Sequence, residues 1–207
     1  MMEQRSEEWF SARLGKVTAS RVSDVIAKTK TGASASRANY MAELLCERLS
    51  GERAQSFSSA AMQWGEEQEG AARAAYSLMT DATVDLVGFV VHPEIPFLGA
   101  SPDGLVGEDG LVEIKCPNTA THIDTLLSGE IEKKYVTQMM VQMACTGRRW
   151  CDFVSFDPRL PPEMQLWIKR VERDQAKISE ITSEVISFLG ELDAKEAELR
   201  ARYMEKA

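Results

Sequence analysis

Side chains that bind transition metals are scarce in this sequence, which has 2 histidines and 4 cysteines among 207 residues. No two cysteines form a CxxC pair, so neither a zinc knuckle nor a thioredoxin-type redox site is indicated, and we expect reduced thiols. Any metal site must then be built mainly from carboxylates, which favour hard cations such as Mg²⁺ or Mn²⁺.

Several other patterns are missing. No apolar run approaches the ~18 residues of a membrane span, and the first residues lack the apolar core of a signal peptide. We therefore expect a cytoplasmic protein with no membrane partner.

Two enzyme motifs are also absent. Neither a GxxxxGKS/T phosphate loop nor a GxSxG elbow is present, which argues against an NTP-driven motor and against a hydrolase with that nucleophile elbow.

The chain is acidic, and its charge is unevenly distributed. Its formal net charge is −8; residues 41–113 hold 3 basic and 13 acidic side chains, whereas residues 1–40 hold 7 basic and 4 acidic. Such a chain is not a non-specific nucleic-acid coater, because that kind of binding needs many cations facing phosphate. The pattern fits carboxylates that collect a metal beside basic residues that bind an anionic substrate. A solvated acidic face is the common alternative.

The length favours one domain over two independent cores. We expect a single domain over residues 1–207, with a core at about 9–173 and an amphipathic C-terminal helix at about 174–205. Apolar spacing predicts helices over residues 9–15, 36–50, 59–79 and 133–145 and another beginning near residue 20. Turn-bounded β-rich segments predict strands over residues 83–92, 111–116, 150–156 and 164–171. The fold class is therefore α/β or α+β, with a central mixed sheet flanked by helices.

Two further segments stand out. Residues 29–36 are rich in Gly and Ser and are predicted to form a mobile loop. The C-terminal helix carries one apolar stripe, formed by Ile178, Ile181, Val185, Phe188, Leu192 and Leu199. That stripe either packs on its own domain, which is the more common case, or binds a partner.

The predicted strand over residues 111–116 carries the candidate chemistry. Side chains two apart on a strand share a face, so the Glu113 carboxylate and the Lys115 ammonium lie side by side. The Gly-containing turn over residues 105–110 makes this strand the second strand of a hairpin. Asp103 lies at the start of the first strand, and the turn therefore brings it alongside Glu113.

Two carboxylates and the backbone carbonyl of Ile114 can together hold Mg²⁺. Lys115 can then orient or help deprotonate a water for attack on a phosphodiester. The alternative is an ordinary salt-bridged hairpin on the surface. Glu69 can add a third carboxylate, and Gln138 and Gln142, one helical turn apart, can add amides. For each of these three alone, a solvent-exposed position is the commoner outcome.

The order of the motifs resembles the phage lambda exonuclease family, the YqaJ-type viral recombinases, which have the PD-(D/E)xK nuclease fold. The combination in this order is more specific than any one part. The matching stretches are residues 9–15 (WFSARLG), 18–20 (TAS), 64–69 (WGEEQE), 101–104 (SPDG), 111–117 (LVEIKCP), 135–138 (YVTQ) and 156–159 (FDPR). The resemblance spans about residues 9–174 and implies a restriction-endonuclease-like core, so that residues 1–207 form a single nuclease domain.

The resemblance also implies roles for the candidate residues. Asp103 and Glu113 would ligate Mg²⁺ with the Ile114 carbonyl, and Lys115 would activate the nucleophilic water. Glu69 would support a second metal or the water. Gln138 would hydrogen-bond near the nucleophile, with Gln142 as a further candidate.

A second group of residues matches the part of the family that binds the DNA end. Arg13 matches a clamp for the 5′-phosphate, and Thr18, Ser20 and Ser101 lie in the accompanying motifs. A guanidinium beside a helix N-terminus capped at residues 18–20 would form an anion pocket. Met62 matches a position that wedges the strands apart, although a helical Met is more often plain core.

The function implied is a Mg²⁺-dependent (alternatively Mn²⁺-dependent) 5′-to-3′ exonuclease that digests linear double-stranded DNA and leaves 3′ single-stranded overhangs for annealing recombination. The partners implied are DNA ends, two further copies in a homotrimeric ring and a single-strand annealing protein, in a phage or prophage. The alternatives are a structure-specific or restriction-type endonuclease and a non-catalytic module that binds DNA ends or protein.

Two further assignments concern single residues. Cys116, next to Lys115, is expected to have a structural role in packing rather than to act as a nucleophile. Basic candidates for lining a DNA channel are Lys28, Lys30, Arg37, Lys133, Lys134, Arg148 and Arg149, each of which alone is more commonly an ordinary surface charge.

Overall fold

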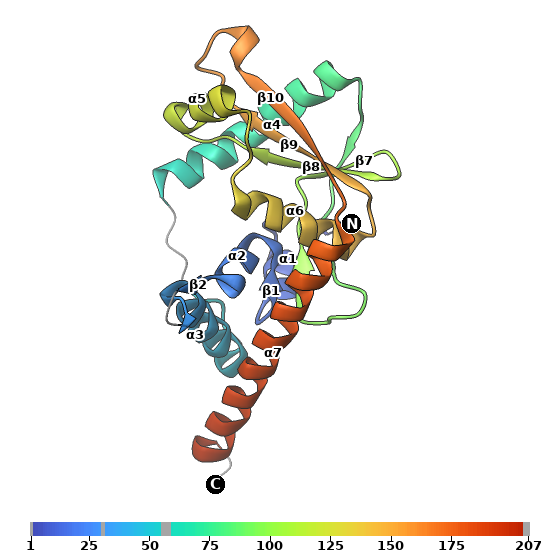
Figure 1. The fold of residues 1–207 in the computed structure, drawn as a ribbon. Helices are drawn as coiled ribbons and strands as arrows, with labels where there is room; N and C mark the ends of the chain where they lie inside the picture. Colours follow the sequence, from blue (N-terminus) through green and yellow to red (C-terminus); the bar gives the residue numbers. More distant parts are fainter. Residues whose placement is uncertain (1, 30–31, 55–58, 205–207) are drawn as a thin grey trace.

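The structure is a computed structural model that describes residues 2–29, 32–54 and 59–204 (Figure 1). The α-helices are α1 Glu7–Arg13, α2 Val22–Ile26, α3 Ala35–Ser50, α4 Ala60–Thr80, α5 Thr119–Ser128, α6 Lys133–Thr146 and α7 Gln175–Tyr203. Short 3-10 helices are η1 Ala19–Arg21 and η2 Pro162–Met164. The strands are β1 Val17–Thr18, β2 Lys28–Thr29, β3 Gly32–Ala33, β4 Val84–Asp85, β5 Val90–Val91, β6 Leu98–Ala100, β7 Gly104–Val106, β8 Gly110–Lys115, β9 Trp150–Phe156 and β10 Leu166–Glu172.

A mixed sheet in the order β10-β9-β8-β7-β4 carries the candidate site. Strands β8 and β9 run parallel, and the other neighbours run antiparallel. The register pairs Lys115 of β8 with Ser155 of β9, so these two strands end at the same edge of the sheet. A mixed sheet flanked by helices, followed by a long C-terminal helix, confirms the predicted fold class.

Helices α4 and α6 cover opposite faces of this sheet. Tyr76 of α4 packs in one apolar cluster with Val112 and Ile114 of β8. Leu111 of β8 belongs instead to the cluster that contains α6. Since side chains alternate along a strand, Glu113 faces α6 as well.

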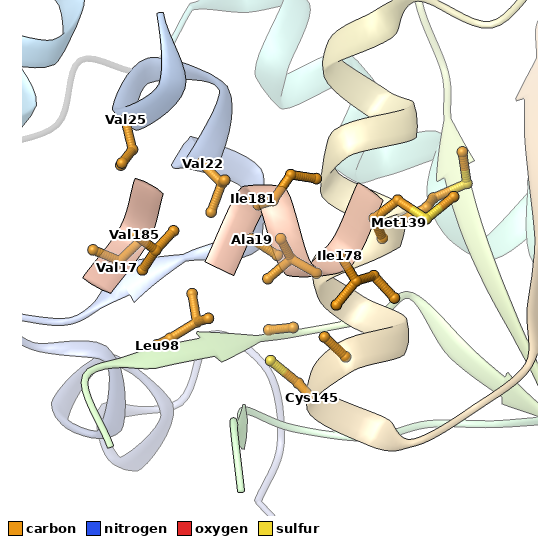
Figure 2. Close-up of a cluster of buried hydrophobic side chains, with 14 of the residues drawn as sticks. Val17, Ala19, Val22, Val25, Leu98, Met139, Cys145, Ile178, Ile181 and Val185 are labelled. Carbon is orange, nitrogen blue, oxygen red and sulfur yellow. The ribbon is translucent and has the colours of Figure 1, made fainter. Parts of the chain in front are cut away.

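The larger apolar cluster joins the α6 side of the sheet to the rest of the molecule. Figure 2 shows it with side chains from β1, η1, α2, β6, α6 and α7. Its labelled members are Val17, Ala19, Val22, Val25, Leu98, Met139, Cys145, Ile178, Ile181 and Val185. Burying one such Val or Ile side chain contributes about 1.5–3 kcal/mol, so this cluster fixes α7 and the N-terminal elements to α6.

Most of the apolar stripe of α7 packs on the chain itself. Its buried members are Ile178, Ile181, Val185, Phe188 and Leu192. Ion pairs reinforce the contact with α3: Arg37 Nη2 lies 2.8 Å from Glu191, and Arg48 Nη1 lies 2.6 Å from Asp193. The prediction that the stripe packs on its own domain is therefore confirmed for these residues.

Several helix boundaries follow from capping residues. The side chains of Ser34, Ser59 and Asp174 accept backbone N–H groups in the first turns of α3, α4 and α7. Gly51 and Gly147 end α3 and α6 in the left-handed conformation, with φ of 71° and 73°. The predicted helices over 36–50, 59–79 and 133–145 are confirmed within about two residues at each end.

Residues 29–36 differ from the prediction of a mobile loop. Strands β2 and β3 pair antiparallel here, with Lys28 opposite Ala33 and Thr29 opposite Gly32, and α3 begins at Ala35. Residues 30–31 lie outside the described residues. Among the described residues of this segment, the Gly and Ser content therefore reflects the β2–β3 pairing and the N-cap of α3.

Other segments also depart from expectation. The helix expected to begin near residue 20 starts instead as the 3-10 turn η1, followed by the short α2. The β-rich segment over residues 83–92 divides into β4 and β5, which join different sheets. Helix α5 was not expected, because its short sequence TATHIDTLLS has few large apolar side chains; Asn118 caps its start and Gly129 its end.

No helix in the described ranges is both long enough and apolar enough to cross a membrane. Cys46, Cys116, Cys145 and Cys151 are all free thiols, as expected.

Candidate active site

The Glu113 side chain on β8 is fully buried, which is costly for a carboxylate unless it is paired. Gln138 Nε2 donates to its Oε1 at 2.7 Å, and Gln142 Nε2 donates to its Oε2 at 2.5 Å. The Lys115 ammonium lies 2.5 Å from the same Oε1. Both carboxylate oxygens are therefore paired, and the burial excludes the alternative of a salt-bridged surface hairpin.

Asp103 lies in the turn between β6 and β7, beside Glu113. Strand β7 pairs antiparallel with β8, with Gly104 opposite Val112, and Ile114 N donates to Asp103 Oδ2 at 2.7 Å. Burial, reinforced by the Glu113 carboxylate, raises the pKa of Asp103 well above its usual range. The hairpin thus brings the two carboxylates together, as its turn residues predict.

Lys115 is held as a cation by its acidic neighbours. Burial alone lowers the pKa of an ammonium, but Glu113 and Asp103 outweigh that effect and raise the pKa of Lys115 above its usual range. The centroid of the Tyr135 ring lies 5.1 Å from Nζ. A protonated amine in this position can donate to a phosphate or water oxygen.

Glu69 approaches the site from α4 but pairs with two arginines. Its Oε1 lies 2.5 Å from Arg73 Nη2, and Arg5 Nη2 donates to its Oε2 at 3.3 Å. It still contributes to the raised pKa of Asp103. In residues 2–29, 32–54 and 59–204, no three His, Cys, Asp or Glu side chains form a ready metal-binding group. A cation at Asp103 and Glu113 would therefore need backbone or water ligands, or a Glu69 that leaves its arginines.

The N-terminal segment also reaches the site, which no pattern in the sequence indicates. Gln4 Nε2 donates to Val87 O and Pro102 O, both at 2.8 Å. Arg5 has a φ of 68°, which is uncommon for a residue other than glycine. A polar segment that precedes α1 thereby contacts the backbone next to Asp103.

Arg13 of α1 lines a cavity of about 270 Å³, together with Thr18 and Ser20. Arg13 Nη1 donates to Ser101 Oγ at 3.2 Å, and its guanidinium carbon lies 4.0 Å from the centroid of the Trp9 ring. Burial lowers the pKa of Arg13 to about 10, so the guanidinium stays charged at neutral pH. A partly desolvated cation in a cavity of this size can bind an anionic group.

Thr18 and Ser20 do not cap a helix, and the expected capped N-terminus at residues 18–20 is therefore wrong. Thr18 precedes the 3-10 helix η1 and makes no side-chain cap hydrogen bond. The two hydroxyl oxygens lie 3.4 Å apart. The chain turns too tightly here for a capped α-helix, so the cavity wall offers hydroxyl groups rather than a row of backbone N–H donors.

Met62 lies in the first turn of α4 and lines the same cavity as Arg13. It is 53% exposed, so it is not a core methionine. Cys116 has a different environment, because burial raises the pKa of its thiol to about 12. An uncharged thiol of this kind agrees with a structural role and not with a nucleophile.

Several of the basic side chains considered for a channel are engaged within the chain. Lys28 pairs with Glu184 and Arg37 with Glu191, while Lys134 pairs with Glu132. Arg148 donates to the carbonyls of Val106, Gly107 and Gly110. Arg149 lies 3.6 Å from Asp109, Lys133 is exposed, and Lys30 lies outside the described residues. Lys28, Arg37, Lys134 and Arg148 therefore have partners inside the chain.

A mixed sheet whose β7–β8 hairpin joins Asp103, Glu113 and Lys115 against a helix has the arrangement of the PD-(D/E)xK nucleases. A family model for the YqaJ-like viral recombinase domain matches residues 8–149, and the chain belongs to this family. No curated protein matches the sequence significantly.

Solved structures agree with the family. The crystal structure of an alkaline exonuclease, LHK-Exo from Laribacter hongkongensis, is 55% identical and has a TM-score of 0.92, with 98% of this chain and 100% of that chain covered. LHK-Exo in complex with dAMP matches equally well. A phage-related exonuclease from Haemophilus somnus 129PT is 17% identical, covers 89% of this chain and 96% of that chain with a TM-score of 0.70, and shares the fold. The family and the LHK-Exo match support a nuclease role.

Proposed function

We propose that the chain is a Mg²⁺-dependent exonuclease that digests linear double-stranded DNA from 5′ ends and leaves 3′ single-stranded overhangs. One observation carries this proposal: Ser101 hydrogen-bonds Arg13 at the cavity, and Asp103, two residues later, lies beside Glu113. Two residues of chain span at most about 7 Å, which is comparable with the step between successive phosphates of a DNA strand. A 5′-phosphate bound by Arg13 would therefore bring the next phosphodiester bond to Asp103.

The residues present fit a hard divalent cation. Asp103 and Glu113 supply carboxylate oxygens, and the Ile114 carbonyl is the nearby backbone ligand. Asp103 Oδ2 accepts from Ile114 N, whereas its Oδ1 accepts no hydrogen bond from the residues that the structure describes. Burial and the Glu113 carboxylate both raise the pKa of Asp103, and a bound cation would relieve the repulsion between the two carboxylates. A bound Mg²⁺, or Mn²⁺ as the alternative, would lower the pKa of a water and stabilise charge on the phosphate.

The chain's own groups would do the remaining work. Lys115, protonated between Glu113 and Asp103, would orient the attacking water and stabilise the phosphate oxygens rather than remove a proton. Gln138 and Gln142 hold the Glu113 carboxylate in one orientation, and Glu69 would exchange its arginine partners for the water or a second cation. Attack of the water on phosphorus breaks the bond to the 3′ oxygen and releases a 5′-mononucleotide. The shortened strand then carries a new 5′-phosphate for the Arg13 cavity, which biases digestion in one direction.

The proposal includes the partners that the family implies: DNA ends, a homotrimeric ring and a single-strand annealing protein. A ring of this kind would keep the enzyme on the duplex between cleavage steps. Light scattering of the purified chain measures the oligomeric state, and a molar mass of about one chain would remove the ring from the proposal.

Linear and covalently closed circular duplexes of the same sequence separate this proposal from its alternatives. An end-dependent exonuclease digests the linear form in Mg²⁺ and leaves the closed circle intact. Cutting of the circle would favour an endonuclease of the same fold. Binding of linear ends without cleavage would favour a non-catalytic module.

A further inference from the structure

Arg159, in the turn that follows β9, is fixed by a buried acid. Its Nε donates to Asp157 Oδ1 at 2.7 Å and its Nη2 donates to Oδ2 at 3.0 Å. Asp157 is fully buried. Burial alone would raise the pKa of Asp157, but the hydrogen bonds from Arg159 lead the effects that lower it to about 2. The pair is therefore ionised, and the guanidinium is held in one plane.

The face of this guanidinium lies over an aromatic ring. The Arg159 Cζ atom is 4.5 Å from the centroid of the Trp64 ring, on α4. An arginine stacked on an aromatic face keeps its edge N–H groups available for other partners. The Trp64 Nε1 atom is itself buried without a hydrogen-bond partner among the described residues. A buried donor of this type can be satisfied by an ordered water or by a bound ligand.

The Arg159–Trp64 pair stands at the edge of the sheet where the candidate site lies. Strands β8 and β9 are parallel and end there together, with Lys115 opposite Ser155. Arg159 Nη2 donates to the carbonyl of Pro117, two residues beyond Lys115, at 3.3 Å. On α4, a Cβ at Gly65, next to Trp64, would lie 3.7 Å from the carbonyl of Cys116. The pair therefore borders the segment that follows β8.

One nitrogen of Arg159 has no partner in the described part of the chain. Nε and Nη2 donate to Asp157 and Pro117, whereas no described residue accepts from Nη1. The side chain is 45% exposed. A charged N–H edge that is oriented, exposed and close to the end of β8 is a donor for an anion.

We propose that the Arg159–Trp64 pair is a DNA contact site, in which Arg159 Nη1 binds a backbone phosphate next to the scissile bond and Trp64 supports the guanidinium. The inference rests on the proposed function, since the ligand is the backbone of the same DNA substrate. It assigns a separate phosphate from the terminal one at Arg13. Asp157 orients the arginine and ties it to the turn after β9, so that the contact sits at a fixed distance from Lys115.

The chain contains a matched arrangement at the other end of β9. Arg170 donates to the buried Asp152 at 2.8 Å and 2.9 Å, and its Cζ lies 3.5 Å from the centroid of the Trp150 ring. Trp150 begins β9 and is paired with Gly110, at the start of β8, five residues before Lys115. Loss of Arg170 therefore removes an equivalent pair of bonds to a buried aspartate and the same charge, but away from the candidate site.

The test measures duplex binding in EDTA, where metal-dependent cleavage does not occur, over a range of NaCl concentrations. We compare wild type, Arg159→Gln, Arg170→Gln and Arg159→Lys by fluorescence anisotropy. The logarithm of the association constant falls linearly with the logarithm of the NaCl concentration, and loss of one phosphate contact makes that slope less steep by about 0.9. This corresponds to about eightfold weaker binding at 0.1 M salt. We expect this change in Arg159→Gln, an unchanged slope in Arg170→Gln, and a slope close to wild type in Arg159→Lys.

Thermal melting of the two glutamine variants shows whether either has lost its fold. If Arg159→Gln does not fold, Trp64→Leu, which keeps the Arg159–Asp157 pair, serves as the second variant and is expected to weaken binding at least threefold. A slope in Arg159→Gln equal to that of wild type overturns the inference, and so does an equal loss in Arg170→Gln. If wild type binds and digests DNA and the folded variants bind it equally well, only this inference is contradicted. Wild type that binds no duplex contradicts the proposed function as well.

Discussion

Gln142 Nε2 donates to Glu113 Oε2 at 2.5 Å, and this contact joins α6 to the middle of the central sheet. Gln138, one turn earlier on the same helix, donates to the other oxygen of the same carboxylate. Neutral amides on two sides and the Lys115 ammonium let a carboxylate stay buried inside the fold. The orientation of Glu113 is thus set before any ligand arrives.

The first prediction concerns the stability that Gln142 provides. Gln142→Met keeps the volume of the side chain but leaves one Glu113 oxygen without its donor, so the free energy of unfolding should fall by roughly 1–3 kcal/mol. Urea denaturation measures the change. Gln63→Met is the matched control, because Gln63 is exposed on α4. Equal small effects in both variants would show that the amide does not support Glu113.

The second prediction concerns Asp103 and pH. Burial and the Glu113 carboxylate raise the pKa of Asp103 in the folded state, so its ionisation opposes folding. The stability that Asp103 contributes in its protonated form is fully present below the ordinary carboxyl pKa. It is lost as the pH rises through the raised pKa of the folded state. Asp103→Asn should therefore be more stable than wild type at pH 8 in EDTA, by roughly 1–3 kcal/mol.

That difference should shrink as the pH falls toward the ordinary carboxyl range. Thermal melting between pH 4 and pH 8 follows it, on a scale of about 1.4 kcal/mol for each pKa unit. Asp85→Asn, at an exposed position on β4, is the control for the loss of one carboxylate at the surface. A destabilised Asp103→Asn at pH 8 would mean that the carboxylate is better compensated than its surroundings indicate.

The third prediction concerns recognition of the DNA end. Arg13→Ala removes the cation of the cavity and should slow digestion of 5′-phosphorylated duplex by at least tenfold, because a charged hydrogen bond to phosphate is lost. Digestion of a 5′-hydroxyl duplex should change little. Melting of the variant shows that the fold persists. Equal rates for wild type and variant on the phosphorylated substrate would rule out the clamp.

The fourth prediction concerns Met62, at the exposed N-terminal end of α4. If its side chain separates the strands, Met62→Ala should digest duplex several-fold more slowly while its rate on single strands is kept. Met79→Ala is the control, since Met79 is 64% exposed at the far end of the same helix. An unchanged ratio of duplex to single-strand rates in Met62→Ala would remove the wedge role.

Features fixed by local spacing could be predicted from the sequence. The hairpin that joins Asp103 to Glu113 follows from a turn and the alternation of a strand, and the pair Gln138 and Gln142 follows from one helical turn. The matching motifs also place Arg13 and Ser101 in one candidate group, although only the structure shows that they are hydrogen-bonded.

Features that depend on distant segments could not be predicted in this way. Gln4 lies 98 residues from the Pro102 carbonyl that it contacts, and Arg5 lies 64 residues from Glu69. Neither contact leaves a periodic signal. Helix α5 was missed because it is short and has few large apolar side chains, so that the caps Asn118 and Gly129 are its main signals. The 3-10 turn at residues 19–21 was missed because hydroxyl residues are equally typical of helix caps and of tight turns.

The proposed function requires that a terminal 5′-phosphate is bound beside a carboxylate site, which cleaves the next phosphodiester bond with a divalent cation. The most direct measurement uses linear duplex labelled on either the first or the last nucleotide of one strand, with and without 5′-phosphate, in Mg²⁺ or in EDTA. We predict that the first nucleotide is released early, that release is faster with 5′-phosphate, and that EDTA stops it. Early release of the last nucleotide, or equal digestion in EDTA, would contradict the proposed function.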